Sequence, residues 1–159
     1  MTRAFIGLGA NLGDPPAQLR TALEAIDPLG RMLAVSPFYR SAPMGPTDQP
    51  DFCNAVCALK TGLAAPALMD ALLAIERGMG RLRTVKWGPR LIDLDLLHVD
   101  GVHCATETLT LPHPGIGQRS FVLVPWADIA ADTTVPGVGL IDEAARSVDR
   151  TGLRRWESG

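Results

Sequence analysis

The chain has 159 residues, of which 47% are hydrophobic and 20% charged, and 15 Lys and Arg against 17 Asp and Glu give a formal net charge of -2. This length favours one domain over residues 1–159, with enough apolar side chains for a sizeable core. The near-neutral charge disfavours general binding of nucleic acid or of an anionic membrane. With three cysteines, no CxxC pair, no signal-peptide pattern and no apolar run of ~18 residues, we expect a reduced, cytoplasmic protein without a membrane span.

Hydrophobic patterning predicts six regular elements before residue 99. Apolar residues at helical spacing mark two helices, and short apolar or alternating runs mark four strands. Asp14 followed by two prolines is typical of a helix N-cap and first turn, and we expect Asn11 to close the turn into that helix. The elements follow the order of a ferredoxin-like βαββαβ sandwich, an α+β fold. They are predicted at residues 3–9 (strand), 15 to about 28 (helix), 31–39 (strand), 52–60 (strand), 65–77 (helix) and 91–98 (strand).

Three further elements are predicted beyond this βαββαβ unit. Asp100-Gly101 is typical of a type I′ hairpin turn, which would pair the preceding strand with a new one at residues 102–105. Residues 119–126 are predicted as an added strand, and residues 140–149 as a C-terminal helix.

Two acidic residues stand within the strand predicted at 91–98. Residues two apart on a strand share a face, so Asp93 and Asp95 point one way while the apolar residues between them point into the core. Adjacent carboxylates repel, and a divalent cation relieves that repulsion; Mg²⁺ typically takes one or two carboxylates together with substrate phosphates. The alternative is an exposed strand face where the acids meet solvent or arginine.

A basic segment leads directly into these acids. Residues 77–90 contain five basic side chains and no acidic one, and their glycines and proline argue against a solvated helix face. Arginines bind phosphate oxygens in a bidentate manner, so the segment is suited to holding a metal–polyphosphate. Trp87, within it, is suited to stacking on a planar ligand or sealing a closed site. Compact domains rarely keep long loops such as 40–51 and 80–90 without a use.

Several other residues are candidates for ligand binding. Phe52 and Asn54 share a strand face, where an aromatic plane beside an amide fits a flat heterocycle with a donor–acceptor edge. A structural role, with the aromatic ring packed on a helix and the amide bonded to backbone, is equally compatible with the pattern. His113 and Arg119 lie in an irregular segment and suggest a second phosphate contact, although a lone histidine more often makes a structural hydrogen bond.

The glycine-rich run at residues 7–13 resembles a dinucleotide-binding fingerprint but does not match it. Its third glycine comes one position late, and no acidic residue ends the next strand. No GxxxxGK[ST] motif occurs, so any nucleotide is bound without a P-loop. No GxSxG motif or cysteine in a basic setting indicates a nucleophile.

Four motifs, in order, resemble the 6-hydroxymethyl-7,8-dihydropterin pyrophosphokinase family. The most specific of them is the run from Lys86 to Leu97, which contains the basic residues, Trp87 and both acids. The four are Gly9-Ala10-Asn11-Leu12-Gly13-Asp14, Tyr39-Arg40-Ser41-Ala42-Pro43-Met44-Gly45 continuing to Asp51-Phe52-Cys53-Asn54, Lys86-Trp87-Gly88-Pro89-Arg90-Leu91-Ile92-Asp93-Leu94-Asp95-Leu96-Leu97, and Leu111-Pro112-His113.

The resemblance implies an ATP-dependent diphosphotransferase of folate biosynthesis, which moves an intact pyrophosphoryl group from MgATP to the pterin hydroxymethyl and releases AMP. It implies two Mg²⁺ ions held by Asp93 and Asp95. The catalytic residues it implies are Arg81, Arg90 and Asp95. The ATP-binding residues it implies are Glu76, Arg81, Arg83, Trp87, Arg90, Thr110, His113 and Arg119. The pterin-binding residues it implies are Ser41, Pro43, Met44, Phe52, Asn54, Trp87 and Phe121. We expect a monomer whose partners are these small molecules.

Two other classes of protein share parts of this pattern. A metal-dependent nucleotide-sugar transferase also uses a DxD motif, but it needs a larger Rossmann-like domain than this strand order provides. An RNA-recognition module shares the βαββαβ order. That module needs alternating aromatic residues on its third strand and a basic sheet face, whereas Phe52 is the only aromatic residue on the strand at 52–60.

Overall fold

The computed structural model describes residues 1–42, 49–80, 91–106 and 109–157. Within them, the main sheet is antiparallel throughout, in the order β10-β3-β4-β1-β5, and β2 pairs with β4 beyond β3. This is the predicted βαββαβ arrangement with its second strand broken in two, and the α+β class is confirmed. The strands of this sheet are β1 (Thr2–Ala10), β2 (Arg31–Val35), β3 (Tyr39–Ser41), β4 (Phe52–Thr61), β5 (Asp93–Val99) and β10 (Arg154–Arg155).

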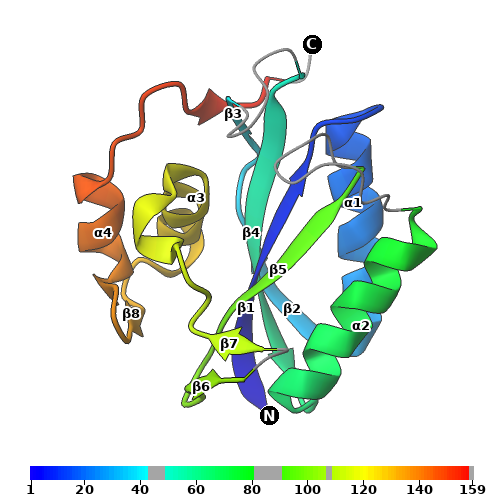
Figure 1. The fold of residues 1–159 in the computed structure, drawn as a ribbon, viewed down its shortest axis with the longest axis vertical. Helices are drawn as coiled ribbons and strands as arrows, with labels where there is room; N and C mark the ends of the chain where they lie inside the picture. The colour runs from blue at the N-terminus through cyan, green and yellow to red at the C-terminus, as the bar shows by residue number, and fades with distance from the viewer. Residues whose placement is uncertain (43–48, 81–90, 107–108, 158–159) are drawn as a thin grey trace.

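Helices cover both faces of the sheet (Figure 1). On one face lie α1 (Pro15–Ile26) and α2 (Ala65–Gly78), and on the other lie α3 (Ser120–Ala130) and α4 (Ile141–Ser147). The shorter elements are the 3-10 turns η1 (Asp27–Leu29) and η2 (Ile116–Gln118) and two strand pairs, β6 (Cys104–Ala105) with β7 (Thr110–Leu111) and β8 (Thr134–Val135) with β9 (Gly139–Leu140). No helix in the described part of the chain is long and apolar enough to cross a membrane.

Strand alternation divides the apolar residues between two cores. Ile6 and Leu8 of β1 are buried against α1 and α2 in the larger core. Phe5, one position away, points to the opposite face and packs against Trp126 of α3, with ring centroids 4.8 Å apart. The first helix begins as predicted, because the Asp14 carboxylate accepts a hydrogen bond from the Ala17 N–H at 3.3 Å.

The predicted strand at 31–39 is interrupted at Ser36. Its backbone N–H still donates to the Val56 carbonyl at 2.9 Å, but its hydroxyl accepts from the Val56 N–H at 3.0 Å and so replaces a ladder carbonyl. Pro37 follows and has no N–H to continue the ladder. The chain therefore leaves β4 after β2 and rejoins it as β3.

Two predictions for the second half of the chain are wrong. The predicted strand at 119–126 is the start of α3, because a continuous apolar run fits a buried helix as well as a buried strand. A turn does form at Asp100-Gly101, but the strand that follows it, β6, pairs with β7 and not with β5. Groups on the outer edge of β5 are already used by Glu76 and by the backbone of His113. The predicted C-terminal helix is confirmed as α4.

Candidate active site

The candidate site lies on the α3-facing side of the sheet, where β1 and β3 end and β4 and β5 begin. In the antiparallel register Gly9 is opposite Asn54 on one side and Asp93 on the other. Gly7 is likewise opposite Asp95. Directly opposed residues share a face, so the amide of β4 and the two carboxylates of β5 flank a central strand that has no side chain at either position.

The two glycines give this face its shape, and sequence reasoning missed that role. A Cβ on Gly9 would lie 3.0 Å from Asn54 Nδ2 and 3.8 Å from a ring carbon of Phe52. A Cβ on Gly7 would make only ordinary contacts, at 3.4 Å or more, with the Leu97 side chain. The signal was the spacing of glycines at alternate positions on one strand face. It indicates close approach of neighbouring groups instead of a phosphate loop.

Ser41 and Asn54 form a buried polar pair beside Phe52. The Ser41 hydroxyl donates to Asn54 Oδ1 at 2.6 Å, and the two residues are 7% and 6% exposed. Because Oδ1 accepts this bond, the donor end of the amide, Nδ2, is the end that lies over Gly9. The structure thus places three of the predicted heterocycle-binding residues on one face, two of them bonded to each other.

His113 lies beside the carboxylates of β5. Its Nε2 is 3.8 Å from Asp95 Oδ1, and its backbone N–H donates to the Leu97 carbonyl at 2.8 Å. Its Nδ1 is 2.6 Å from the Pro114 carbonyl oxygen. A carbonyl can only accept, so Nδ1 carries a hydrogen and Nε2 is the nitrogen directed toward Asp95. The family resemblance assigned both residues to an MgATP site, but no local sequence pattern predicted this contact.

Glu76 supports β5 from α2. This glutamate is 3% exposed, and its Oε2 accepts a 2.7 Å hydrogen bond from the backbone N–H of Leu94, the residue between the two acids. The bond satisfies an N–H at the outer edge of the sheet. Glu76 therefore fixes the position of the strand that carries Asp93 and Asp95.

The other described residues that were predicted to bind substrates, Arg119, Phe121 and Thr110, differ in their exposure. Arg119, partly buried, precedes α3, and its guanidinium lies against the backbone of Gly115, where a Cβ would be 3.3 Å from Nε. Phe121 is half-buried against the second core, and Thr110 is exposed on β7. Arg81, Arg83, Trp87, Arg90, Pro43 and Met44 lie outside the described residues.

Asn11, predicted to close the turn into the first helix, makes hydrogen bonds to the residues just before β4. It is 2% exposed, and its Nδ2 donates to Gln49 Oε1 at 2.9 Å and to the Pro50 carbonyl at 3.0 Å. These bonds tie the end of β1 to the residues just before β4. The Asn11 side chain therefore connects the end of β1 to the segment that leads into β4.

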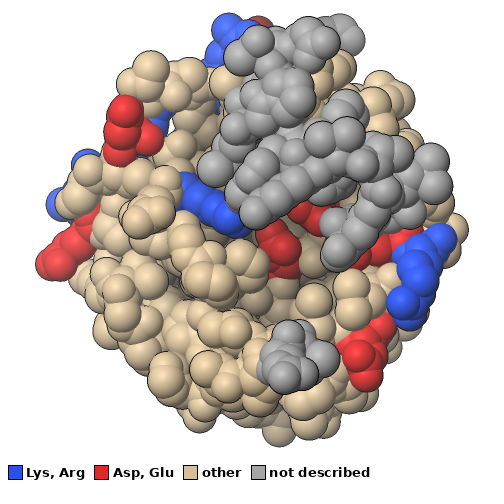
Figure 2. Space-filling view, viewed as in Figure 1, with Lys and Arg blue, Asp and Glu red and all other residues tan. Residues whose placement is uncertain are grey.

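The ionisation of the cysteines and the distribution of charged side chains limit the chemistry that is available at the site. Burial raises the pKa of Cys53 and of Cys57 to about 12, so neither thiol on the opposite face of β4 is a thiolate near neutral pH. Among the described residues no three His, Cys, Asp or Glu side chains form a complete metal cage. Among the described residues, Figure 2 shows acidic and basic side chains interspersed on the face drawn there.

Comparisons with known proteins agree on one family. Residues 5–131 match the family described as 7,8-dihydro-6-hydroxymethylpterin-pyrophosphokinase (HPPK). The chain is 44% identical over 159 residues to the 2-amino-4-hydroxy-6-hydroxymethyldihydropteridine pyrophosphokinase of Methylorubrum extorquens, covering 99% of this chain and 100% of that protein. It is 43% identical over 155 residues to the pyrophosphokinase of the same name from Pseudomonas aeruginosa, covering 96% of each.

Solved structures support the fold. The wild-type HPPK-DHPS of Plasmodium falciparum, crystallised with pteroate, superposes with a TM-score of 0.74 at 14% identity. The match covers 91% of this chain and 42% of that one, so the chain spans less than half of the length of that protein. Together with the sequence matches, these findings show that the chain belongs to the 7,8-dihydro-6-hydroxymethylpterin-pyrophosphokinase family.

Proposed function

We propose that this chain transfers a pyrophosphoryl group from MgATP to the hydroxymethyl group of 6-hydroxymethyl-7,8-dihydropterin, giving the pterin diphosphate and AMP. It is a pyrophosphokinase of folate biosynthesis by family. The observation that carries the assignment of its site is one row across the sheet. In this row, Gly9 lies between an amide on one neighbouring strand, which can hydrogen-bond to a heterocycle, and a carboxylate on the other, which can bind a cation.

The pterin would bind at the β3–β4 side of this row. A pterin is flat and has a donor–acceptor edge, which the Asn54 amide and the Ser41 hydroxyl can match, while the Phe52 ring offers a face for stacking. The 2.6 Å bond between Ser41 and Asn54 holds the amide in one orientation before the ligand arrives. The full set of proposed pterin-binding residues is Ser41, Pro43, Met44, Phe52, Asn54, Trp87 and Phe121.

Asp93 and Asp95 would hold magnesium, for which we propose two ions. Two carboxylates on one strand face, without further acidic ligands from the described residues, fit a cation that completes its coordination with water and phosphate oxygens. When bound, Mg²⁺ neutralises the triphosphate and polarises the phosphoryl group under attack. Glu76 keeps the strand between the two acids in place through the Leu94 N–H.

The ATP would lie over the β5 side of the site, with its phosphates near His113 and Arg119. The histidine is already anchored through its Nδ1–H and its backbone N–H, so its Nε2 can face a phosphate as well as Asp95. The proposed ATP-binding residues are Glu76, Arg81, Arg83, Trp87, Arg90, Thr110, His113 and Arg119. Among these Arg81 and Arg90, together with Asp95, are proposed as catalytic.

The reaction needs orientation and charge neutralisation more than a strong base. A bond forms between the hydroxymethyl oxygen and the β-phosphorus of ATP, the bond from that phosphorus to the α–β bridging oxygen breaks, and the hydroxyl proton is released as AMP departs. Ser41 and Asn54 would hold the pterin so that its hydroxymethyl faces the β5 side. Arg81 and Arg90 would stabilise the charge that develops on the transferred group.

We further propose a cytoplasmic monomer that acts on small molecules and binds neither nucleic acid nor membrane. The net charge of -2 supports the part of this proposal that concerns nucleic acid and membrane. Sedimentation analysis at micromolar concentration would test the monomer, with a second, heavier species as the contrary result.

The proposed reaction is tested by incubating the purified protein with MgATP and 6-hydroxymethyl-7,8-dihydropterin and separating the nucleotides by chromatography. We expect AMP to accumulate in step with the pterin diphosphate and no ADP to form. Phe52→Ala should mainly raise the KM for the pterin, because it removes the stacking face. Folded wild-type protein that releases no AMP, or that releases ADP instead, would refute the proposal.

A further inference from the structure

The C-terminal segment, Arg154 to Trp156, lies against the outer edge of β3. Arg154 pairs with Arg40 and Arg155 with Tyr39, and the backbone N–H of Trp156 donates to the Phe38 carbonyl at 2.9 Å. Figure 1 shows the chain returning past α4 to reach this edge. The segment is outside the part of the chain that the family description matches, which ends at residue 131.

Side chains reinforce this backbone pairing on both sides of β3. The Arg40 guanidinium carbon lies 4.0 Å from the centroid of the Trp156 ring, and Arg40 also pairs with Asp51 at 3.8 Å. The Arg155 guanidinium carbon lies 5.2 Å from the Tyr39 ring centroid. The Trp156 ring packs, partly buried, against the larger core. Each cation–π contact adds to the pairing of a strand that is only three residues long.

The strand held in this way carries half of the proposed pterin-recognition pair. Tyr39 is opposite Asn54 and Ser41 is opposite Phe52 in the β3–β4 register, so a shift of β3 moves the Ser41 hydroxyl relative to the amide that it orients. Tyr39, which β10 pairs with, also donates from its hydroxyl to Asp128 of α3 and so connects this end of β3 to the helix layer. Only the pairing with β10 holds the outer edge of β3 within the described sheet.

We propose that Trp156 and β10 form a positioning element for the pterin pocket, acting through β3 on the Ser41–Asn54 pair. This inference rests on the proposed function, because it assigns the C-terminal segment a role in binding the acceptor substrate. The proposal predicts different effects on the binding of the two substrates. The carboxylates on β5 are separated from β3 by β4 and β1, so loss of the C-terminal contacts should weaken pterin binding and leave MgATP binding unchanged.

The test compares Trp156→Ala with Trp156→Phe and with Ile141→Ala. Ile141 is a fully buried residue of the second core in α4, so its truncation destabilises the protein without touching β3. Pterin binding is measured by calorimetry in the presence of Mg²⁺ and α,β-methylene-ATP, whose α–β bridge cannot break. Affinity for the nucleotide is measured separately, and circular dichroism checks that each variant is folded at the temperature used.

We expect Trp156→Ala to weaken pterin binding about three- to tenfold, the size of one lost cation–π contact or hydrogen bond, with nucleotide affinity unchanged. Trp156→Phe should retain most of the wild-type pterin affinity, and Ile141→Ala should bind the pterin with the wild-type affinity. Equal pterin affinity in wild type and Trp156→Ala, or an equal loss in Ile141→Ala, would overturn the positioning role alone. Wild-type protein that binds no pterin would overturn the proposed function as well.

Discussion

The two ends of one sheet face are built from the same strands and have opposite chemistry. Toward the start of β1, Phe5, His98 and Trp126 pack their rings together under α3. Toward the end of β1, the corresponding face has glycine in the centre, with Asn54 and Asp93 on either side. Only three residues of β1 lie between Phe5 and Gly9, and the β1–β5 register shifts once between Phe5 and Ile6, so a packed end and the proposed binding end are close together on one strand.

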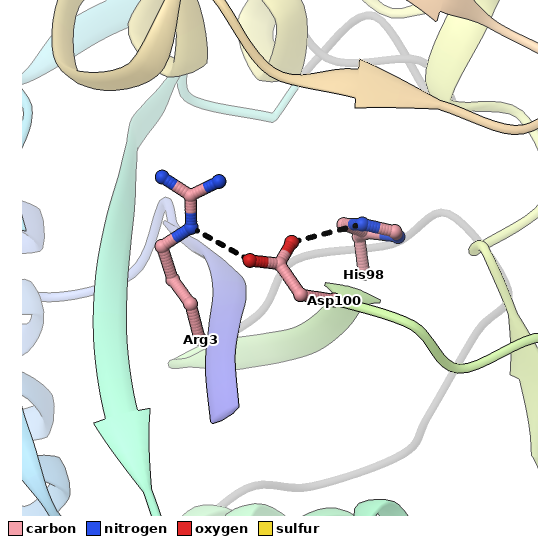
Figure 3. A network of polar contacts seen from close by, with 3 residues as sticks. All are labelled: Arg3, His98 and Asp100. Atoms are coloured by element: carbon pink, nitrogen blue, oxygen red, sulfur yellow. Dashed lines mark hydrogen bonds and ion pairs between the residues drawn. The ribbon is translucent and has the colours of Figure 1, made fainter. Parts of the chain in front are cut away.

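Each end contains charged groups, but they are used differently. At the packed end, Asp100 is a shared acceptor: Arg3 Nε donates to one of its oxygens at 3.0 Å, and His98 Nε2 faces the other at 3.3 Å (Figure 3). At the open end, Asp95 is paired at 3.8 Å with a histidine that is itself anchored elsewhere. Asp100 is held by two basic partners of the packed end, whereas Asp95 is one of the two carboxylates that we propose to bind the magnesium of MgATP.

Phe5→Ala tests the packed end and should give the largest effect. Phe5 is fully buried between His98 and Trp126, so its truncation should lower the free energy of unfolding by about 3–5 kcal/mol. Urea denaturation followed by circular dichroism measures this loss. The KM values of the remaining folded protein at low temperature should stay near those of wild type. A changed KM for both substrates would show that the two ends are not separable.

Asp95→Asn tests the end of the face that carries the carboxylates, and it should lower turnover instead of stability. The amide keeps the shape of the carboxylate but not its charge, so we expect turnover to fall about 100- to 1,000-fold, the usual cost of removing one preorganised electrostatic group. The free energy of unfolding should be unchanged or slightly higher, because a repulsion with Asp93 is removed. AMP release in saturating substrates and urea denaturation are the two measurements. Wild-type turnover would remove Asp95 from the catalytic set.

Gly9→Ala should give a smaller effect, confined to the pterin. The added Cβ would lie 3.0 Å from Asn54 Nδ2, and Ser41 already holds the other end of that amide. The amide must shift, so we expect the KM for the pterin to rise about tenfold, comparable to one misplaced hydrogen bond, with the KM for MgATP unchanged. Gly7→Ala is the matched control, since its Cβ would meet only the flexible Leu97 side chain at 3.4 Å or more. Equal effects of the two substitutions would contradict the assigned role of Gly9.

Local sequence pattern predicted most of the helices and strands, because residues within or next to each element mark its start or its type. Asp14 and the prolines after it marked the start of α1, and alternation marked β4 and β5. The strand predicted at 119–126 was wrong because periodicity alone does not distinguish a short apolar strand from a buried helix. The break at Ser36 depends on a hydroxyl bonding to another strand, which local sequence does not reveal.

The site shows the same limit more sharply. Strand periodicity predicted that Asp93 and Asp95 share a face, and the register confirms it. The meeting of Asp95 with His113, and the use of Glu76 to hold β5, depend on which segments reach the outer edge of that strand. Those are long-range facts of topology. The C-terminal pairing with β3 was likewise beyond any local pattern, because only two residues form the strand.

The smallest predicted effect is a pH dependence of stability from the packed end. Burial lowers the pKa of His98 below its usual 6.5, and the nearby Asp100 carboxylate only partly opposes this shift. A second proton would sit on Nδ1, which is buried and has no hydrogen-bond acceptor among the described residues. The folded state therefore binds fewer protons than the unfolded state just below pH 6.5, and the free energy of unfolding should fall as the pH falls, by at most about 1.4 kcal/mol per pH unit.

The measurement is urea denaturation of wild type and His98→Gln at several pH values from 7.5 down to mildly acidic conditions. The glutamine variant is less stable throughout but does not titrate at this position, so the gap between the two proteins should narrow as the pH falls below about 6.5. Arg3 and Asp100 are present in both proteins, so the two proteins differ only at position 98. A gap that stays constant would mean that His98 binds its second proton equally well in the folded and unfolded states. The packed end would then tolerate a charge as readily as the open end, and the contrast between them would be one of shape alone.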